Sequence, residues 1–203
     1  KALSELFAKE SLDAVMHFAG VISMAESMEN PYKYFYTNTF GALILFEIMV
    51  KHNVSKLIFS STAGVYGNPV HLPIKENDPK EPTNPYGASK LMVEQMLSLY
   101  DQIYGLKSIS LRYFNAAGAT LDGAFGEDHK DETHIIPIAT RAALSKSEFT
   151  IYGDDYKTKD GACIRDYVHV IDLCDAHLLA LDALVNGHKT DFFNVGPGVG
   201  YSN

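Results

Sequence analysis

Tyr86 and Lys90 are the residues whose types and spacing most directly suggest chemistry. They stand four positions apart at the start of an apolar-periodic stretch, so a helix there would place them on one face. A cation beside a phenol stabilises the phenolate and lowers a side-chain pKa that is ordinarily ~10. A tyrosine altered in this way can act as a general base on a hydroxyl group. Taken alone, the pair fits a surface tyrosine near a surface lysine better than it fits catalysis, and it is the surrounding sequence that favours catalysis.

Three hydroxyl side chains precede this pair at the end of a predicted buried strand. Ser60, Ser61 and Thr62 close an apolar run, and open α/β folds bind their ligands at the carboxyl ends of parallel strands. Thr62 could hydrogen-bond the same substrate oxygen as Tyr86. A polar strand end without a function is the alternative interpretation.

Small residues close another predicted strand. The run over 12–20 is apolar and ends in Phe18, Ala19 and Gly20, which is typical of a buried strand followed by a tight loop. Backbone amides in such a loop are open to a dinucleotide. Asn38, on the helix predicted next, offers a polar side chain for the same ligand.

Strands and helices alternate along the chain, which predicts an α/β fold with a doubly wound parallel sheet of the Rossmann type. The strands of this sheet are expected at 12–20, 56–61 and 108–114, and its helices at 31–53 and 85–104. We assign residues 1–115 to this domain and residues 116–203 to a smaller, mixed α/β lobe, with 165–185 returning to the first domain. The lobe is expected to contain helices at 135–145 and 171–185 and strands at 149–152, 167–170 and 192–195.

Composition narrows the class of protein. The net charge of −8 disfavours nucleic acid and anionic membranes as partners, and no apolar run is long enough to span a bilayer. Two cysteines, Cys163 and Cys174, fit reduced thiols, so we expect a soluble, cytoplasmic protein. The eight histidines are scattered, which predicts no metal site. The chain is expected to begin inside a helix and to end with Ser202 as the N-cap of another, so both ends look cut.

Several motifs together resemble the extended short-chain dehydrogenase/reductase superfamily. They are His17-Phe18-Ala19-Gly20, Phe59 to Gly67, Pro85 to Lys90 and Leu111 to Asn115. Within that superfamily, the segments Gly153 to Tyr156 and Arg165 to Leu173 and the late glycine loop from Asn194 to Ser202 are similar to the UDP-glucose 4-epimerase family. The resemblance covers nearly the whole chain.

The resemblance implies a tightly held NAD that removes a hydride from C4 of a UDP-hexose and returns it to the other face of a 4-keto intermediate, a reaction of galactose metabolism. It makes Tyr86 the base, which Lys90 activates while holding the nicotinamide ribose, and it lets Thr62 position the sugar oxygen. It implies contacts with NAD from Phe18, Ala19, Gly20, Asn38, Ser60, Tyr86, Lys90 and Phe114. It implies substrate contacts from Thr62, Tyr86, Tyr113, Asn115, His134, Ile135 and Ile136, with Ile151 and Tyr152 near the uracil and Arg165 on the diphosphate. A homodimer is also implied.

Alternatives remain open. A sugar 4,6-dehydratase needs an acid pair just after the strand-end hydroxyl, whereas Ala63 and Gly64 follow Thr62. A UDP-sugar 4-epimerase of different specificity would share every motif above. An inactive truncated product is the third possibility, because the glycine-rich turn that cradles a pyrophosphate would lie before residue 1. Arg165 could instead pair structurally with Asp166 or Asp172.

Overall fold

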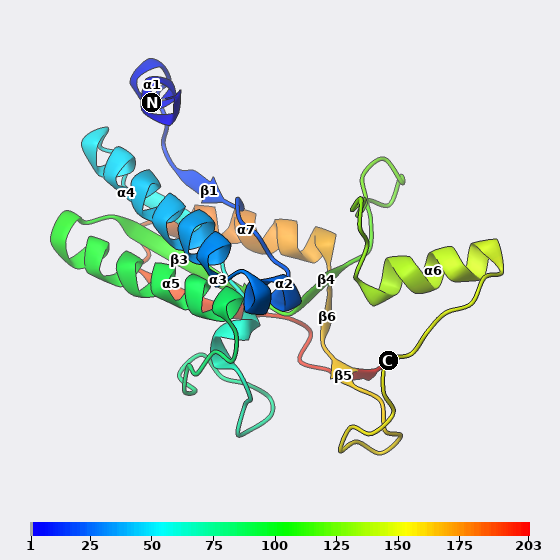
Figure 1. Ribbon diagram of the computed structural model, residues 1–203. Coiled ribbons are helices and arrows are strands. Elements are labelled where there is room, and N and C mark those ends of the chain that lie inside the picture. The colour runs from blue at the N-terminus through cyan, green and yellow to red at the C-terminus, as the bar shows by residue number, and fades with distance from the viewer. Residues whose placement is uncertain (1) are drawn as a thin grey trace. The chain divides into compact units, whose positions relative to one another are not determined.

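A computed structural model describes residues 2–203 and divides them into two compact units (Figure 1). Unit 1 contains the residues up to Tyr113 together with Ala176–Val195, and unit 2 contains Phe114–Asp175 and Gly196–Asn203. The sequence led us to expect a division after residue 115 and a return over 165–185. The return begins later because the strand that leads into the last long helix lies in unit 2.

Unit 1 is built on a parallel sheet with the strand order β1-β2-β3-β7. Its strands are β1 (Val15–His17), β2 (Lys56–Ser60), β3 (Lys107–Tyr113) and β7 (Asp191–Val195). The register places Ile58 beside Ile109 and Leu111 beside Phe193. The predicted α/β fold is confirmed, although β1 is shorter than the run over 12–20 suggested.

Helices surround the sheet of unit 1. They are α1 (Ala2–Lys9), α2 (Met24–Glu29), α3 (Pro31–Tyr34), α4 (Gly41–Lys51), α5 (Pro85–Tyr104) and the part of α7 (Val170–Val185) that begins at Ala176, with a π-helical segment η1 (Phe35–Phe40) and a 3₁₀ turn η2 (Ala63–Tyr66). Figure 1 shows α4 and α5 side by side along the sheet. The single helix predicted over 31–53 is therefore three segments, with the π-helical one in the middle.

The sheet buries a different set of side chains on each face, because successive residues of a strand point in opposite directions. Phe59 of β2 packs in a cluster with Phe46 of α4 and Leu97 of α5. Its neighbour Ile58 packs in a separate cluster with Leu184 of α7. These side chains are at most 3% exposed, and each contributes ~1.5–3 kcal/mol by leaving water. Two apolar layers thus fix the strand ends in place.

Local signals set the bounds of α5, which confirm the helix predicted over 85–104. At its start, Asn84 Oδ1 accepts a hydrogen bond from the backbone N–H of Gly87 at 2.9 Å, and Pro85 occupies the first turn. At its end, Gly105 adopts a φ of 71°, a left-handed conformation that suits glycine. Tyr86 is consequently held in the first turn of a well-capped helix.

Unit 2 has two small sheets and one helix. Parallel strands β4 (Asn115–Ala117) and β6 (Tyr167–His169) form one sheet, antiparallel strands β5 (Ile164–Arg165) and β8 (Tyr201–Ser202) form the other, and the helix is α6 (Ile135–Ser145). The prediction of a strand over 149–152 is wrong, because these residues are irregular and belong to none of the sheets of the described chain. Ser202 is not an N-cap either, since it lies in β8 and donates its hydroxyl to Asp160 at 2.6 Å.

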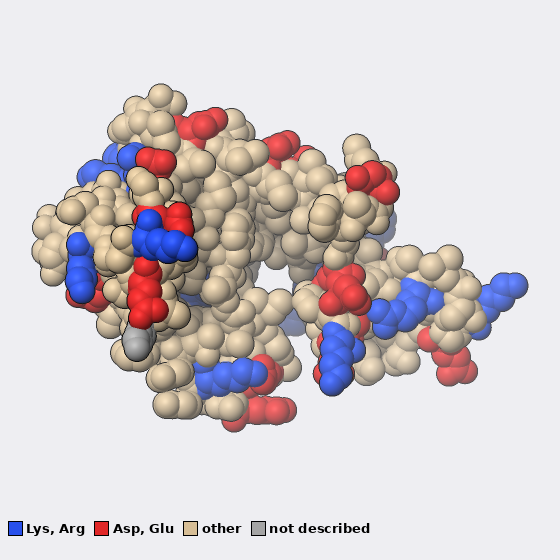
Figure 2. Space-filling model, turned by 90° about the horizontal axis from the view of Figure 1, so that it is seen from above, with Lys and Arg blue, Asp and Glu red and all other residues tan. Residues whose placement is uncertain are grey.

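Two further features of the fold concern membrane-spanning helices and the distribution of surface charge. Among the described residues, no helix has the length and apolar character that crossing a membrane requires. Figure 2 shows acidic and basic side chains interspersed on the face that it presents.

Candidate active site

The carboxyl ends of β1, β2 and β3 gather the candidate residues of unit 1 at one edge of the sheet. Phe18, Ala19 and Gly20 follow β1 and are exposed, whereas Ser60 ends β2 and Tyr113 ends β3. Parallel strands share a direction, so these chain segments meet where an open α/β sheet binds its ligands. Segments that are distant in sequence therefore contribute to one locality.

Lys90 is a buried ammonium at this edge. It is 3% exposed, its Nζ donates a hydrogen bond to the carbonyl oxygen of Ser60 at 2.9 Å, and it lies 4.9 Å from the ring centre of Phe59. Burial lowers the pKa of Lys90 to about 8. The ammonium is charged at neutral pH and has three N–H donors, so donors remain for a bound hydroxyl group.

Tyr86 is half-buried, and in this structure it is a weak acid. Burial raises the pKa of its phenol to about 12, a hydrogen bond with Thr62 works in the opposite direction, and the nearby Tyr113 raises it further. The sequence led us to expect that Lys90 lowers this pKa, but the ammonium of Lys90 is directed at the carbonyl of Ser60 instead. The protein alone therefore keeps the phenol protonated, and a ligand must supply what favours the phenolate.

The hydroxyl groups of Ser60 and Thr62, at the end of β2, form hydrogen bonds within the protein. Thr62 is 8% exposed, and its Oγ1 accepts from the backbone N–H of Gly64 at 3.0 Å, which caps η2. The Ser60 hydroxyl hydrogen-bonds the phenol of Tyr113. Thr62 and Tyr86 come from separate elements and interact with each other.

Asn38 fastens the loop after β1. It lies in the π-helical η1 and is 3% exposed. Its Oδ1 accepts from the backbone N–H of Val21 at 2.9 Å, and its Nδ2 donates to the Val21 carbonyl and to Ser89 Oγ, both at 3.0 Å. The extra residue in a π-turn is a common device at functional sites, and here it directs an amide into the loop.

Gly20 packs closely against Asn38 and Lys90. A Cβ at this position would lie 2.9 Å from Asn38 Oδ1, closer than Cβ contacts in folded proteins, and 3.5 Å from Lys90 Nζ, so any larger residue would displace Asn38. Phe18 is 56% exposed, and its ring packs 4.7 Å from the ring of His177. The loop thus presents an exposed backbone beside the Lys90 ammonium, whose remaining N–H donors suit ribose oxygens.

Sequence reasoning missed a buried ion pair that supports this edge. Arg112 of β3 and Glu94 of α5, both 2% exposed, form a two-pronged contact, from Nε to Oε1 at 2.9 Å and from Nη2 to Oε2 at 2.6 Å. Ser61 donates its hydroxyl to the same Oε1 at 2.6 Å. Glu94 stands four residues after Lys90, so one carboxylate ties α5 to the strand that ends in the hydroxyls. No residue spacing signalled this pairing, because Glu94 and Arg112 are 18 residues apart and lie on different elements.

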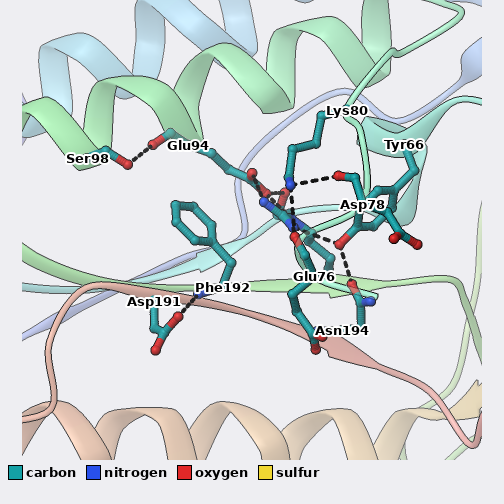
Figure 3. Close-up of polar contacts among 11 residues, drawn as sticks. Tyr66, Glu76, Asp78, Lys80, Glu94, Ser98, Asp191, Phe192 and Asn194 are labelled. Atoms are coloured by element: carbon teal, nitrogen blue, oxygen red, sulfur yellow. Dashed lines mark hydrogen bonds and ion pairs between the residues drawn. The ribbon is translucent and has the colours of Figure 1, made fainter. Parts of the chain in front are cut away.

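Two further side chains complete this network. Tyr66 accepts from Arg112 Nη1 at 2.7 Å and donates to Asn194 Oδ1 at 2.8 Å, and Figure 3 shows Tyr66, Glu94 and Asn194 converging from three elements. The network borders a cavity of about 440 Å³. The cavity is lined by Glu76, Lys80, Leu91, Glu94, Gln95, Ser98, Arg112 and Phe192, none of which was a predicted site residue.

The candidate residues in unit 2 are held more loosely. Phe114 is partly buried, and Asn115 Nδ2 donates to the carbonyl of Asp166 at 2.9 Å. Ile151 and Tyr152 lie in an irregular segment and are 67% and 87% exposed. Arg165 is exposed and donates only to the carbonyl of its neighbour Ile164; among the described residues no ion pair with Asp166 or Asp172 forms.

The segment before α6 departs from expectation. His134 is the N-cap residue of α6, and Ile135 and Ile136 form its first turn. The histidines were expected to be scattered, yet ligand atoms of Glu127, His129, Glu132 and His134 all lie within 4.8 Å of one another. The sequence analysis missed this group because His129 and His134 are five residues apart in a loop, and only the turn between them brings them together.

Comparisons with known proteins identify the family of the chain. The family model for the NAD dependent epimerase/dehydratase family matches residues 1–196. The UDP-glucose 4-epimerase of Lacticaseibacillus casei is 52% identical over 202 residues, which are 99% of this chain and 61% of that relative.

Solved structures give the same result. A UDP-glucose 4-epimerase from Brucella ovis in complex with NAD has a TM-score of 0.95 at 44% identity, covering 99% of this chain and 62% of that chain. A UDP-glucose 4-epimerase from Bifidobacterium longum in complex with NAD⁺ and UDP has a TM-score of 0.89 at 41% identity, covering 98% of this chain and 61% of that chain. The chain thus spans about three fifths of the length of the relatives it matches.

Proposed function

Because this chain belongs to the NAD dependent epimerase/dehydratase family, we propose that the protein interconverts UDP-glucose and UDP-galactose by removing and returning a hydride at sugar C4. The observation that carries the proposal is the placement of Tyr86, Thr62 and Lys90 at the same sheet edge as the exposed backbone of Gly20. Relatives that match nearly the whole chain carry the same enzyme name.

In this proposal Tyr86 moves the proton. It removes the proton of the C4 hydroxyl as the 4-keto sugar forms, and it returns a proton to that oxygen when the sugar has turned over. Thr62, which interacts with Tyr86, hydrogen-bonds the same oxygen. NAD, when bound, supplies the hydride acceptor and donor at C4.

Two groups make this proton transfer feasible. Burial leaves the pKa of Tyr86 at about 12, so the phenolate must be favoured by positive charge placed beside it. Lys90 donates from its buried ammonium to the nicotinamide ribose and adds its own charge. Asn38, Ser60 and the backbone of Phe18 to Gly20 hold the rest of the cofactor, together with Phe114.

Unit 2 is assigned the nucleotide of the substrate. Arg165 is an exposed guanidinium, and its planar fork suits the oxygens of a diphosphate. The exposed apolar surfaces of Ile151 and Tyr152 suit a uracil ring. Contacts to the sugar nucleotide are further assigned to Tyr113, Asn115, His134, Ile135 and Ile136.

We propose three wider properties on the strength of the family and its relatives. The protein works in galactose metabolism, it acts in the cytoplasm, and it forms a homodimer through helices in the regions 35–50 and 91–104. Sedimentation of the whole protein tests the last of these, since a monomer at working concentration contradicts it.

A sugar 4,6-dehydratase is the competing reaction within this family. That reaction needs an acid next to the strand-end hydroxyl, and Ala63 and Gly64 occupy those positions in η2. The experiment is to give the whole protein UDP-galactose carrying deuterium at C4. Epimerisation is expected to deliver UDP-glucose with the deuterium still at C4, whereas a 4-keto-6-deoxy product supports the dehydratase, and absence of any product contradicts both.

A further inference from the structure

Two histidines and two glutamates converge in the segment before α6. Of these four residues, only His134 is also assigned a substrate contact above. His129 Nδ1 lies 3.1 Å from Glu127 Oε1 and 3.6 Å from Glu132 Oε2. His134 Nδ1 contacts Glu127 Oε1 and lies 3.8 Å from Glu132 Oε1. The four side chains therefore direct nitrogen and oxygen ligand atoms toward a common point.

Glu132 provides an independent indication that this point accepts a cation. Its side chain is only 2% exposed. Its Oε1 accepts from the backbone N–H groups of Thr133 and His134, both at 2.8 Å, whereas its Oε2 is buried and has no hydrogen-bond partner among the described residues. A buried carboxylate oxygen without a partner is costly unless positive charge lies beside it.

We propose that Glu127, His129, Glu132 and His134 form a structural binding site for a divalent zinc-like metal ion. Zinc bonds to imidazole nitrogen and carboxylate oxygen at about 2.0–2.2 Å, which places neighbouring ligand atoms about 3.3–3.6 Å apart in a tetrahedron. Three of the separations, 3.1, 3.6 and 3.8 Å, lie near this spacing, whereas Glu127 Oε1 and His134 Nδ1 are closer together and must move apart to share an ion. Four protein ligands leave no open position, so the site is of the structural kind.

The ligand chemistry selects the class of ion. Two imidazoles favour zinc and its transition-metal neighbours, whereas magnesium and calcium prefer sites made of oxygen alone. Glu127 would give up its close contact with His134 to share the ion with it.

The position of the site suggests what the ion does. Glu132 and His134 stand immediately before α6, whose N-cap residue, His134, makes no side-chain capping hydrogen bond. An ion bound there fixes the entry into the helix. If the proposed function holds, the ion also orders the backbone of Ile135 and Ile136, which are assigned to the substrate. The metal site itself does not depend on that function.

The test is calorimetric titration of the whole, chelator-treated protein with ZnCl₂ and, separately, with MgCl₂. We expect one zinc per chain with a Kd below about 1 µM and no comparable signal for magnesium. Glu132→Gln and His129→Gln should each weaken zinc binding at least about 100-fold. Asp131→Asn, in the same segment but outside the four ligands, is the matched control and should bind zinc as the parent does.

Two results would overturn the proposal. One is the absence of a zinc-binding event in the parent protein, and the other is a Kd that both ligand variants leave unchanged. Circular dichroism of each variant shows whether it is folded, and the two variants carry the test independently. Because the readout is metal binding, a protein without epimerase activity can still confirm the site, and an active one can still refute it.

Discussion

Unit 1 and unit 2 hold their candidate functional side chains in different ways. In unit 1, Lys90 and Asn38 are each 3% exposed. Lys90 is hydrogen-bonded to a residue 30 positions away, and Asn38 to residues 17 and 51 positions away. In unit 2, Tyr152 is 87% exposed, and among the described residues the guanidinium of Arg165 donates only to the carbonyl of the adjacent Ile164. The residues proposed for cofactor binding in unit 1 are thus held by the protein's own hydrogen bonds, whereas those proposed to bind the nucleotide in unit 2 are exposed and loosely held.

The largest effect should come from the proton carrier in unit 1. We expect Tyr86→Phe to lower kcat of the whole protein at least about 1,000-fold while the fold stays intact, because the C4 hydroxyl loses its base. Turnover of UDP-galactose measures this. Tyr104→Phe, which removes the same hydroxyl from a residue that is 54% exposed, should leave kcat unchanged. Near-normal turnover of Tyr86→Phe would remove Tyr86 from the role of base.

The buried support of unit 1 should be the next most sensitive. Glu94→Gln removes the charge that Arg112 and Ser61 share. Breaking one side of a buried pair strands the other charge, so we expect the free energy of unfolding to fall by about 3–5 kcal/mol. Urea denaturation checks this, with Glu47→Gln on the exposed surface as the control. Equal midpoints for the two variants would show that the pair does not stabilise the fold.

Unit 2 should respond in KM rather than in kcat. Removing a charged hydrogen-bond donor to a diphosphate costs about 1.5–3 kcal/mol, so Arg165→Ala should raise KM for UDP-galactose by about 10- to 150-fold with kcat nearly unchanged. Arg141→Ala, an exposed arginine of α6, is the matched control. A fall in kcat with unchanged KM would place Arg165 in the chemical step and erase the contrast between the units.

The smallest effect is a pH dependence that belongs to unit 1. Burial lowers the pKa of Lys90 to about 8, so its ammonium is charged below that pH and loses its proton as the pH rises through it. NAD should therefore bind up to about tenfold more weakly at pH 9 than at pH 7 in cofactor-free protein. Calorimetry measures this, and Lys90→Arg, which keeps its charge, should not show the loss. An equal loss in that variant would assign the titration elsewhere.

The sequence predicted the parts of the molecule that continuous elements determine. Helix α5 begins and ends where Asn84, Pro85 and Gly105 indicate, and the hydroxyls of Ser60 and Thr62 lie at the strand end as expected. The pairing of Glu94 with Arg112 escaped prediction because the chain between them gives no periodic signal that they meet.

Electrostatics and loops were the harder part to predict. Spacing placed Lys90 near Tyr86 but did not reveal that the ammonium turns to the carbonyl of Ser60 and leaves the phenol a weak acid. The loop that brings His129 to His134 has no repeat from which its shape could be read. Both features depend on the direction of hydrogen bonds and on burial, and residue spacing reveals neither of these.

Cofactor retention is the most direct test of the proposed function. The whole protein is purified without added cofactor and denatured, and the released fraction is assayed for NAD and NADH. We expect about one dinucleotide per chain, because the exposed backbone of Gly20 lies beside the Lys90 ammonium, whose remaining N–H donors suit ribose oxygens. If no dinucleotide is released and none binds on titration, hydride transfer at C4 is contradicted.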